Sequence, residues 1–486
     1  MSVRTPLRAV CHLLGILLSI GCSSGDDDIG IELIDRYHRL QHTHVDTTAS
    51  QEIDAYLDYS LGMGEGMRAT ASHNAALQNF LAGRTVSYYR VGQSAEPTPI
   101  DIMSSSANFM DLANFRDRGS RLKEVMDRIV AAPRRSSVFI TDFERILPDA
   151  RQMLPGAPAP HPIDASAWAQ EHLRRWLLAG HRVDVFAHRY SKPDAWFGGK
   201  SAATQENWIY TIVFTPAPIL KDPLAYASSA LAFLLEEHGD KQSPQYRHYW
   251  YWADAFRVDA KNDAAIGNAN PNLALIDFQR GTGRPAHDLH VIDSEDLRQF
   301  AEGDELGNSR TLLAVRIRSE VPFLSAIKYG VKVRDATGAL RLLRAADTDA
   351  AARVQKGPEN AVDTPTSATR GPSRAKSVEA VTRAAAASAA IDSVFAHVFN
   401  EKTGELGIML KSDFVGVTEP TVYQVDVVVT DAMVGSFSDA REVLTLNYSG
   451  GYQIHALGES IRLAVRDVAS AMRGKVLYSF YVKIEP

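Results

Sequence analysis

The sequence predicts an α/β domain followed by a β-rich, sandwich-like domain. Between residues 49 and 220, apolar strand patterns alternate with helical patterns, which is typical of a mainly parallel sheet flanked by helices. From residue 271 onward, short strand-like runs follow one another with few helices between them. The chain of 486 residues also exceeds what one hydrophobic core usually serves, so more than one domain is expected.

The α/β prediction is organised around one stretch near its start. The apolar run from Ile53 to Leu57 is short, which is typical of a strand buried inside a parallel sheet. Glycines from Gly62 to Gly66 then permit a tight turn into a helical pattern. Asp58 and Ser60 follow the strand directly, where open α/β sheets bind their ligands. The stretch therefore predicts a ligand site at this strand end.

Three segments resemble the metal-ion-dependent adhesion site of von Willebrand factor A-type domains. Asp58-Tyr59-Ser60-Leu61-Gly62 resembles its Asp-x-Ser-x-Ser motif, with Gly62 in place of the second Ser. Gly119-Ser120 precedes a helical run to Val130, where the family places a Thr ligand. Val138 to Asp142 is an apolar strand that ends in Thr-Asp, like the family's Thr-Asp-Gly. The resemblance implies a von Willebrand factor A-like fold over residues 49–220, with a mainly parallel sheet flanked by helices.

The resemblance also implies a divalent-cation site formed by Asp58, Ser60, Ser120 and Asp142. Ser60 and Ser120 would ligate the ion directly, and the two aspartates would bind through water. Hydroxyl and carboxylate oxygens suit Mg²⁺, or Mn²⁺ or Ca²⁺, rather than zinc. In the family the open coordination position accepts a carboxylate from a partner, so the expected partner is an unknown protein or surface ligand. Gly62 offers no side-chain oxygen, so water would fill that position.

Other interpretations of these residues stay open. Asp58 and Asp142 could cap helices or loops in a degenerate site, which would make the protein a structural envelope scaffold. The same two carboxylates could serve as an acid–base pair in an envelope hydrolase. Separately, His42-Thr43-His44-Val45-Asp46 has ligands found in metallohydrolases, but a polar lead-in to the first strand is the simpler interpretation.

Residues 1–21 have the pattern of a bacterial export signal. Arg4 and Arg8 precede an apolar run, Val10 to Ile20, that is too short to span a bilayer. Leu18-Ser19-Ile20-Gly21-Cys22 resembles a lipobox, which implies cleavage before Cys22 and a lipid on that residue. Residues 22–48 then form a tether. The expected location is the cell envelope, lipid-anchored, at the outer membrane of a Gram-negative bacterium.

The remaining chain divides into a bridge, 221–270, and the β-rich domain, 271–486. In the bridge, Tyr249, Trp250 and Trp252 predict either a partner surface or packing at the domain junction. In the β-rich domain, Leu340 to Leu343 is expected to be a strand, and the Ala-, Ser- and charge-rich residues 346–390 a flexible excursion. The formal net charge of −6 argues against nucleic-acid binding. Both cysteines lie within the first 22 residues, so no disulfide is expected in the domains.

Overall fold

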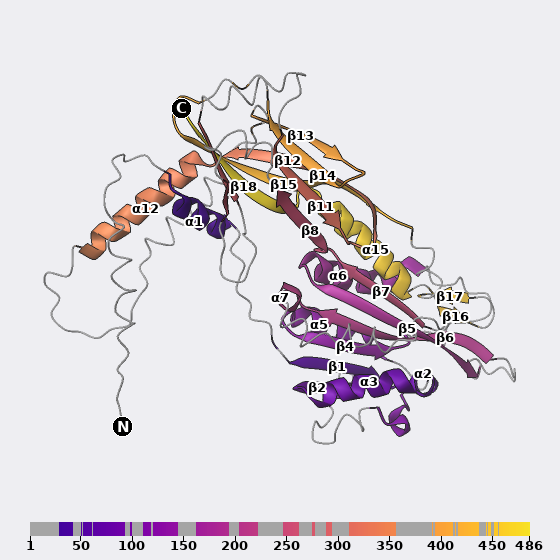
Figure 1. The fold of residues 1–486 in the computed structure, drawn as a ribbon. Coiled ribbons are helices and arrows are strands. Elements are labelled where there is room, and N and C mark those ends of the chain that lie inside the picture. Colours follow the sequence, from indigo (N-terminus) through magenta and orange to yellow (C-terminus); the bar gives the residue numbers. More distant parts are fainter. Residues whose placement is uncertain are drawn as a thin grey trace, which may run out of the picture.

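The computed structural model has a mixed α/β part and a β-rich part (Figure 1). It describes residues 29–41, 50, 52–60, 62–92, 98–99, 110–117, 120–143, 162–193, 204–221, 246–261, 275–277, 288–293, 311–355, 391, 394–411, 414, 417–436, 444, 446–448, 452–454 and 456–486. The predicted signal peptide, Cys22 and the His42 to Asp46 motif lie outside these residues.

A seven-stranded sheet forms the centre of the α/β part, with strand order β3-β2-β1-β4-β6-β5-β7. The interior strand β1 pairs in parallel with β2 on one side and β4 on the other. All six residues of β1 are buried, as the apolar run predicted. The strands are β1 (Ile53–Asp58), β2 (Val86–Val91), β3 (Thr98–Pro99), β4 (Ser136–Thr141), β5 (Arg182–Pro193), β6 (Thr204–Thr215) and β7 (Tyr246–Trp252).

The prediction of a mainly parallel sheet is wrong, because the sheet is mixed. Only β1, β2 and β4 run parallel; the pairs β2–β3, β4–β6, β5–β6 and β5–β7 are antiparallel. The chain between β5 and β6, residues 194–203, explains part of this difference. A parallel crossover needs a dozen or more residues, so a connection of this length returns the chain as an antiparallel hairpin.

Helices cover both faces of this sheet. On one face, Met63 and Met67 of α2 (Met63–Ala69) and Leu77 of α3 (Ala71–Ala82) pack on the apolar side chains of β1. On the other face lie α5 (Leu122–Ala131) and α6 (Pro162–Leu178), whose buried residues share a core with Tyr56 and Phe139. The short elements are η2 (Leu112–Asn114) and α7 (Ala217–Lys221).

The β-rich part contains two sheets, which agrees with the predicted sandwich-like arrangement at the level of sheet count and strand pairing. Their orders are β12-β15-β18-β10-β9 and β13-β14-β11-β8, and all pairs except β10–β18 are antiparallel. Tyr329 of the first sheet meets Phe399 of the second edge-on, with ring centroids 5.0 Å apart. The strands are β8 (Phe256–Lys261), β9 (Leu275–Asp277), β10 (Asp288–Asp293), β11 (Thr311–Ser319), β12 (Leu324–Asp335), β13 (Phe395–Asn400), β14 (Glu405–Leu410), β15 (Thr421–Val434) and β18 (Val476–Glu485), with a separate hairpin of β16 (Leu446–Tyr448) and β17 (Tyr452–Ile454).

Two helices, α1 (Ile31–Gln41) and α12 (Thr337–Gln355), pack against the larger of these sheets. The strand expected at Leu340 to Leu343 is therefore wrong: this run is helical, and its two end residues are buried against α1 while Leu342 is exposed. The first ten residues of the expected excursion, 346–355, also continue α12. Alanine and arginine favour helix, so the composition that suggested disorder also supports a helix where one has already begun. Residues 356–390 lie outside the described residues.

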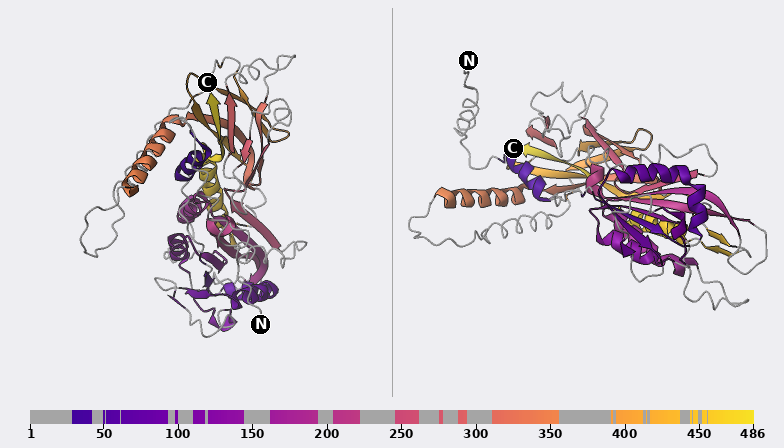
Figure 2. Two further views of the ribbon diagram at one scale, coloured as in Figure 1. Left: turned by 60° about the vertical axis from the view of Figure 1, so that its left-hand side comes forward. Right: turned by 90° about the horizontal axis from the view of Figure 1, so that it is seen from below.

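The C-terminal helix α15 (Ala456–Ala471) connects the two parts. It packs along α6 of the α/β part and also contacts β15 (Figures 1 and 2). Gln170 of α6 donates a hydrogen bond to Asp467 of α15 at 2.9 Å. The bridge is likewise divided, since β7 extends the α/β sheet and β8 belongs to the smaller β-sheet. Thus β7, from the predicted bridge, is an edge strand of the seven-stranded sheet, and α15, from the predicted β-rich domain, also packs on the α/β part.

Candidate functional site

The predicted site lies at the carboxyl end of β1. The helices after β1, α2 and α3, cover one face of the sheet, whereas α5, which leads into β4, covers the other. The connections therefore leave β1 and enter β4 on opposite faces, and ligands of open α/β sheets bind in the crevice at such a point. Asp58, the last residue of β1, is fully buried at this position.

Hydroxyl groups surround the Asp58 carboxylate. Ser120 Oγ donates to Oδ1, and Thr141 Oγ1 donates to Oδ2 at 3.0 Å. The backbone N–H of Ser60 donates to Oδ1 at 2.9 Å. Burial raises the pKa of Asp58, while hydrogen bonds from Ser120, Ser60 and Thr141 oppose that rise. The carboxylate is thus desolvated and held by neutral donors.

Ser120 and Thr141 reach Asp58 from different elements. Ser120 lies two residues before α5, and Arg121 at the helix N-cap makes no side-chain cap. Ser120 therefore contributes its hydroxyl to Asp58, 62 residues away in the chain. Thr141 ends β4, and the register that pairs Leu57 with Ile140 puts Thr141 beside Asp58 on the same face. The N–H of Phe143 donates to Thr141 Oγ1 at 2.9 Å, which leaves the Thr141 proton for Asp58.

Asp142 follows Thr141 and is buried, at 1% exposure. The next residue, Phe143, has φ 57°, a left-handed conformation that bulky residues rarely adopt. The Thr-Asp-Gly motif of the resembled family has Gly at this position, whereas the Phe143 side chain is buried in the core beside α5 and α6. The backbone turn after the second aspartate is therefore held by a buried aromatic side chain.

The mouth of the site carries an ion pair. Ser60 is partly exposed, and its backbone forms an isolated parallel bridge with Asp117. Arg90 donates to both carboxylate oxygens of Asp117 at 3.0 Å. A Cβ on Gly92 would overlap Asp117 Oδ2, so a larger residue there would require the Asp117 side chain to move. The basic and acidic side chains are thus fixed beside Ser60.

Thr141, Asp117 and Arg90 were not in the predicted ligand set. Thr141 could have been predicted from the sequence. It ends β4 as Asp58 ends β1, and the last residues of two neighbouring parallel strands of equal length lie side by side. Asp117 and Arg90 have no comparable sequence signal. Their pairing depends on the position of the segment before α5, which no local pattern fixes.

The donor set of this site fits a hard divalent cation. Asp58 and its hydrogen-bond partners Ser60, Ser120 and Thr141, together with Asp142, which follows Thr141 in the chain, supply only carboxylate and hydroxyl oxygens, which Mg²⁺, Mn²⁺ and Ca²⁺ prefer. Within the described residues, no group of three or more His, Cys, Asp or Glu side chains could hold a metal ion. A cation here would therefore depend on the hydroxyl groups as well as on the two aspartates. Among the described hydrogen-bond partners of Asp58, none is a histidine or lysine.

The three aromatic residues of the possible partner surface belong to β7, at the edge of the seven-stranded sheet. All three are partly buried and pack against the main hydrophobic core. Trp252 Nε1 donates to the carbonyl of Gly180 at 3.1 Å, and the Arg182 guanidinium lies 4.8 Å from the Trp250 ring centroid. Tyr249, Trp250 and Trp252 therefore favour the packing interpretation.

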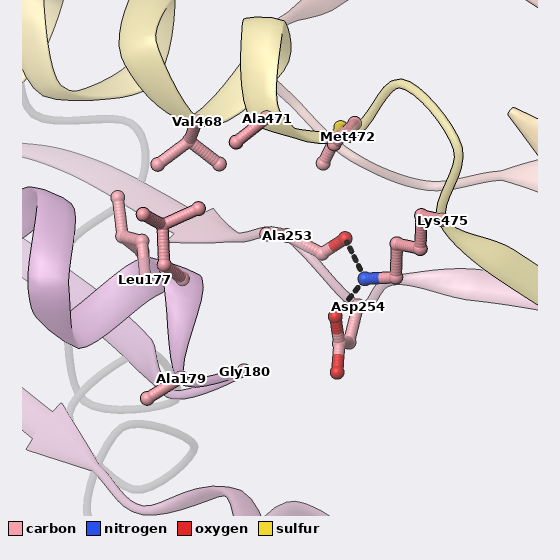
Figure 3. Close-up of a pocket in the computed structure, with 10 residues that line it drawn as sticks. Leu177, Ala179, Gly180, Ala253, Asp254, Val468, Ala471, Met472 and Lys475 are labelled. Atoms are coloured by element: carbon pink, nitrogen blue, oxygen red, sulfur yellow. Dashed lines mark hydrogen bonds and ion pairs between the residues drawn. The ribbon is translucent and has the colours of Figure 1, made fainter. Parts of the chain in front are cut away.

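A separate pocket of about 310 Å³ lies where the C-terminal ends of α6 and α15 meet (Figure 3). Its wall combines the apolar side chains of Leu177, Val468 and Met472 with the charged Asp254 and Lys475. The Lys475 ammonium group pairs with Asp254 and donates to the Ala253 carbonyl at 3.2 Å. The ammonium group is thus held by the protein's own acceptors, and none of the predicted site residues lines this pocket.

Comparison of the chain with protein-family models, curated proteins and solved structures finds no match.

Proposed function

We propose that the protein is a lipid-anchored component of a bacterial cell envelope that binds a protein or surface ligand through a divalent cation. The cation would be held by Asp58, Ser60, Ser120 and Asp142, with Thr141 as an additional oxygen donor. The lipid would be attached at Cys22, as the lipobox-like sequence implies. No helix in the described part of the chain is long and apolar enough to span a membrane.

The hydrogen bond between Ser120 and Asp58 is the observation that best supports the cation site. The motif resemblance implied that Asp58 and Ser120 are ligands of one ion, although 62 residues separate them in the chain. Their contact places a second hydroxyl beside the buried carboxylate, together with Thr141. A bound cation would offset the desolvation of Asp58 by direct charge attraction.

A thermal-shift experiment tests this proposal. Millimolar Mg²⁺ or Mn²⁺ should raise the melting temperature relative to chelator, because a ligand that binds only the folded state stabilises it by about 2.7 kcal/mol at a hundred times its Kd. Asp142→Ala and Ser120→Ala should abolish the increment. Ser470→Ala is the matched control, since Ser470 is an exposed serine on α15 and its loss should leave the increment unchanged.

The second candidate function is a structural scaffold with a degenerate site. It is favoured by one observation: the Asp58 carboxylate already accepts hydrogen bonds from Ser120, Thr141 and the Ser60 N–H. If Mg²⁺, Mn²⁺ and Ca²⁺ all leave the melting temperature of the wild-type protein unchanged, the scaffold function is favoured instead.

A further inference from the structure

The N-terminal helix α1 is attached to the β-rich part of the molecule. Its Ile34 and Tyr37 are buried against the β18 residue Tyr481 and the α12 residue Leu340. His38 Nδ1 and the Tyr481 hydroxyl form a hydrogen bond of 3.0 Å. The described chain begins at Ile29, which is buried in the same cluster. The start of the described chain is therefore held on the α1 and α12 side.

This position limits where an anchor at Cys22 can lie. Ile29 follows Cys22 by seven residues, and seven residues span at most about 25 Å when fully extended. A lipid on Cys22 would thus keep α1 within that distance of the bilayer surface. The α/β part carries no such restraint of its own.

The Asp58 site lies on the other side of the molecule. It is followed directly by α2, which lies far from α1 and α12 in Figure 1, and the two further views keep the same separation. The two parts are held together by α15, which packs on α6 and β15. A bilayer next to α1 would therefore leave the carboxyl end of β1 away from it.

We propose that α1 and α12 form the surface that faces the phospholipid bilayer, so that the Asp58 site is presented at the membrane-distal end. This inference rests on the proposed lipid anchor at Cys22. The ligand would then bind at the Asp58 site, on the end of the molecule that points away from the membrane, and the α1 and α12 surface would contact the lipid headgroups.

The side chains of α12 are compatible with such a surface. The residues described as exposed on this helix are Gly338, Arg341, Leu342, Ala345 and Thr348. Their one charged side chain, Arg341, donates to Glu419 at 2.9 Å, and Glu32 of α1 is also exposed, so this surface carries charges of both signs. Leu342 is 49% exposed, and an apolar side chain next to an arginine suits the boundary between headgroups and acyl chains.

Site-specific fluorescence quenching tests this orientation. Single cysteines replace Leu342 on α12 or the exposed Ala69 on α2, since the mature lipidated chain has no other free thiol. Each labelled, lipidated protein is inserted into phosphatidylethanolamine and phosphatidylglycerol vesicles that carry a nitroxide on the headgroup. The label at Leu342→Cys should lose most of its fluorescence, and the label at Ala69→Cys should keep it. Ala345→Cys, one turn further along α12, should behave like Leu342→Cys.

Equal quenching at α2 and α12, or stronger quenching at α2, would overturn the orientation. A protein that fails to float with the vesicles would refute the anchor and the orientation together. The cation site is measured separately, by the melting temperature of the same labelled proteins with Mg²⁺ and with chelator. Loss of the cation effect with the quenching pattern intact would refute only the proposed binding function.

Discussion

Gly62 occupies the position where the resembled motif has its second serine. Its φ of −62° and ψ of −31° are helical, so any L-residue can adopt them. We therefore expect Gly62→Ser to fold and, by adding a hydroxyl ligand, to tighten cation binding. Isothermal titration with Mn²⁺ should give a lower Kd than the wild type. Gly62→Ala is the control for the added Cβ, and equal affinities of the two variants would contradict a ligand role for the new hydroxyl.

Phe143 combines an unfavourable backbone conformation with a buried aromatic ring. The left-handed conformation costs roughly 1–2 kcal/mol, whereas removing a buried Phe side chain costs about 3–5 kcal/mol. Phe143→Gly should therefore lower the free energy of unfolding by about 1–4 kcal/mol, and Phe143→Ala should lower it further because the strain remains. Urea titration measures both. A Phe143→Gly protein more stable than the wild type would show that the ring contributes little.

At this scale the sequence identified some of the residues that meet at the end of β1 but not all of their neighbours. Asp58 and Ser120 form the predicted contact because a strand end and the start of a helix meet at the sheet edge. Thr141 was overlooked because the motif directed attention to Asp142. The pair Arg90 and Asp117 could not be predicted, since it requires knowledge of how the segment before α5 folds back on β1 and β2.

At the scale of elements, α3 packs against β5 through a pair of histidines. The rings of His73 and His188 lie 4.4 Å apart, and Tyr246 of β7 lies 4.9 Å from His188 on another side. Burial lowers the pKa of His188 from 6.5 to about 4. The neutral ring is thus the form that the folded protein accommodates.

This packing makes stability depend on pH. Because the pKa of His188 is lower in the folded than in the unfolded chain, its contribution is fully present above pH 6.5 and is lost as the pH falls toward 4. The loss is at most about 3 kcal/mol, since a tenfold change in proton affinity is worth about 1.4 kcal/mol. His188→Phe keeps a ring at this position and should flatten the dependence in urea titrations between pH 7 and 4. Identical slopes for both proteins would contradict this role.

The directions of the strands in the seven-stranded sheet could not be predicted from local sequence patterns. Local patterns identified the buried strand from Ile53 to Leu57 and the strand that leads to Asp142. Pairing between β4 and β6 or between β5 and β7 joins segments that are distant in the sequence. Alternation of helices and strands gives no information about such partners, so the sheet was expected to be more parallel than it is.

At the scale of the whole molecule, α15 contributes to a hydrophobic core that the two parts share, so we expect them to unfold together. Val468 is fully buried in the core that includes α6, the seven-stranded sheet and both β-sheets. Val468→Asp should destabilise the protein by several kcal/mol, because a buried unpaired carboxylate is costly. Fluorescence in urea should show one transition, shifted to lower concentration. Ser470→Asp, on the exposed face of the same helix, should stay within about 0.5 kcal/mol of the wild type.

Two separate transitions in Val468→Asp, one of them at the wild-type midpoint, would show that the parts fold independently. A single shifted transition would instead establish that the core is shared.

The contact between α6 and α15 also limits how early the chain can complete its folding during synthesis. Gln170 and Asp467 are 297 residues apart, and the partners His38 and Tyr481 are separated by 443. A ribosome that adds about 5–20 residues per second needs roughly 15–60 s to travel from α6 to α15. Throughout that interval the side of α6 that packs on α15 has no permanent cover. Burial of this side of α6 is therefore completed only when nearly the whole chain has been synthesised.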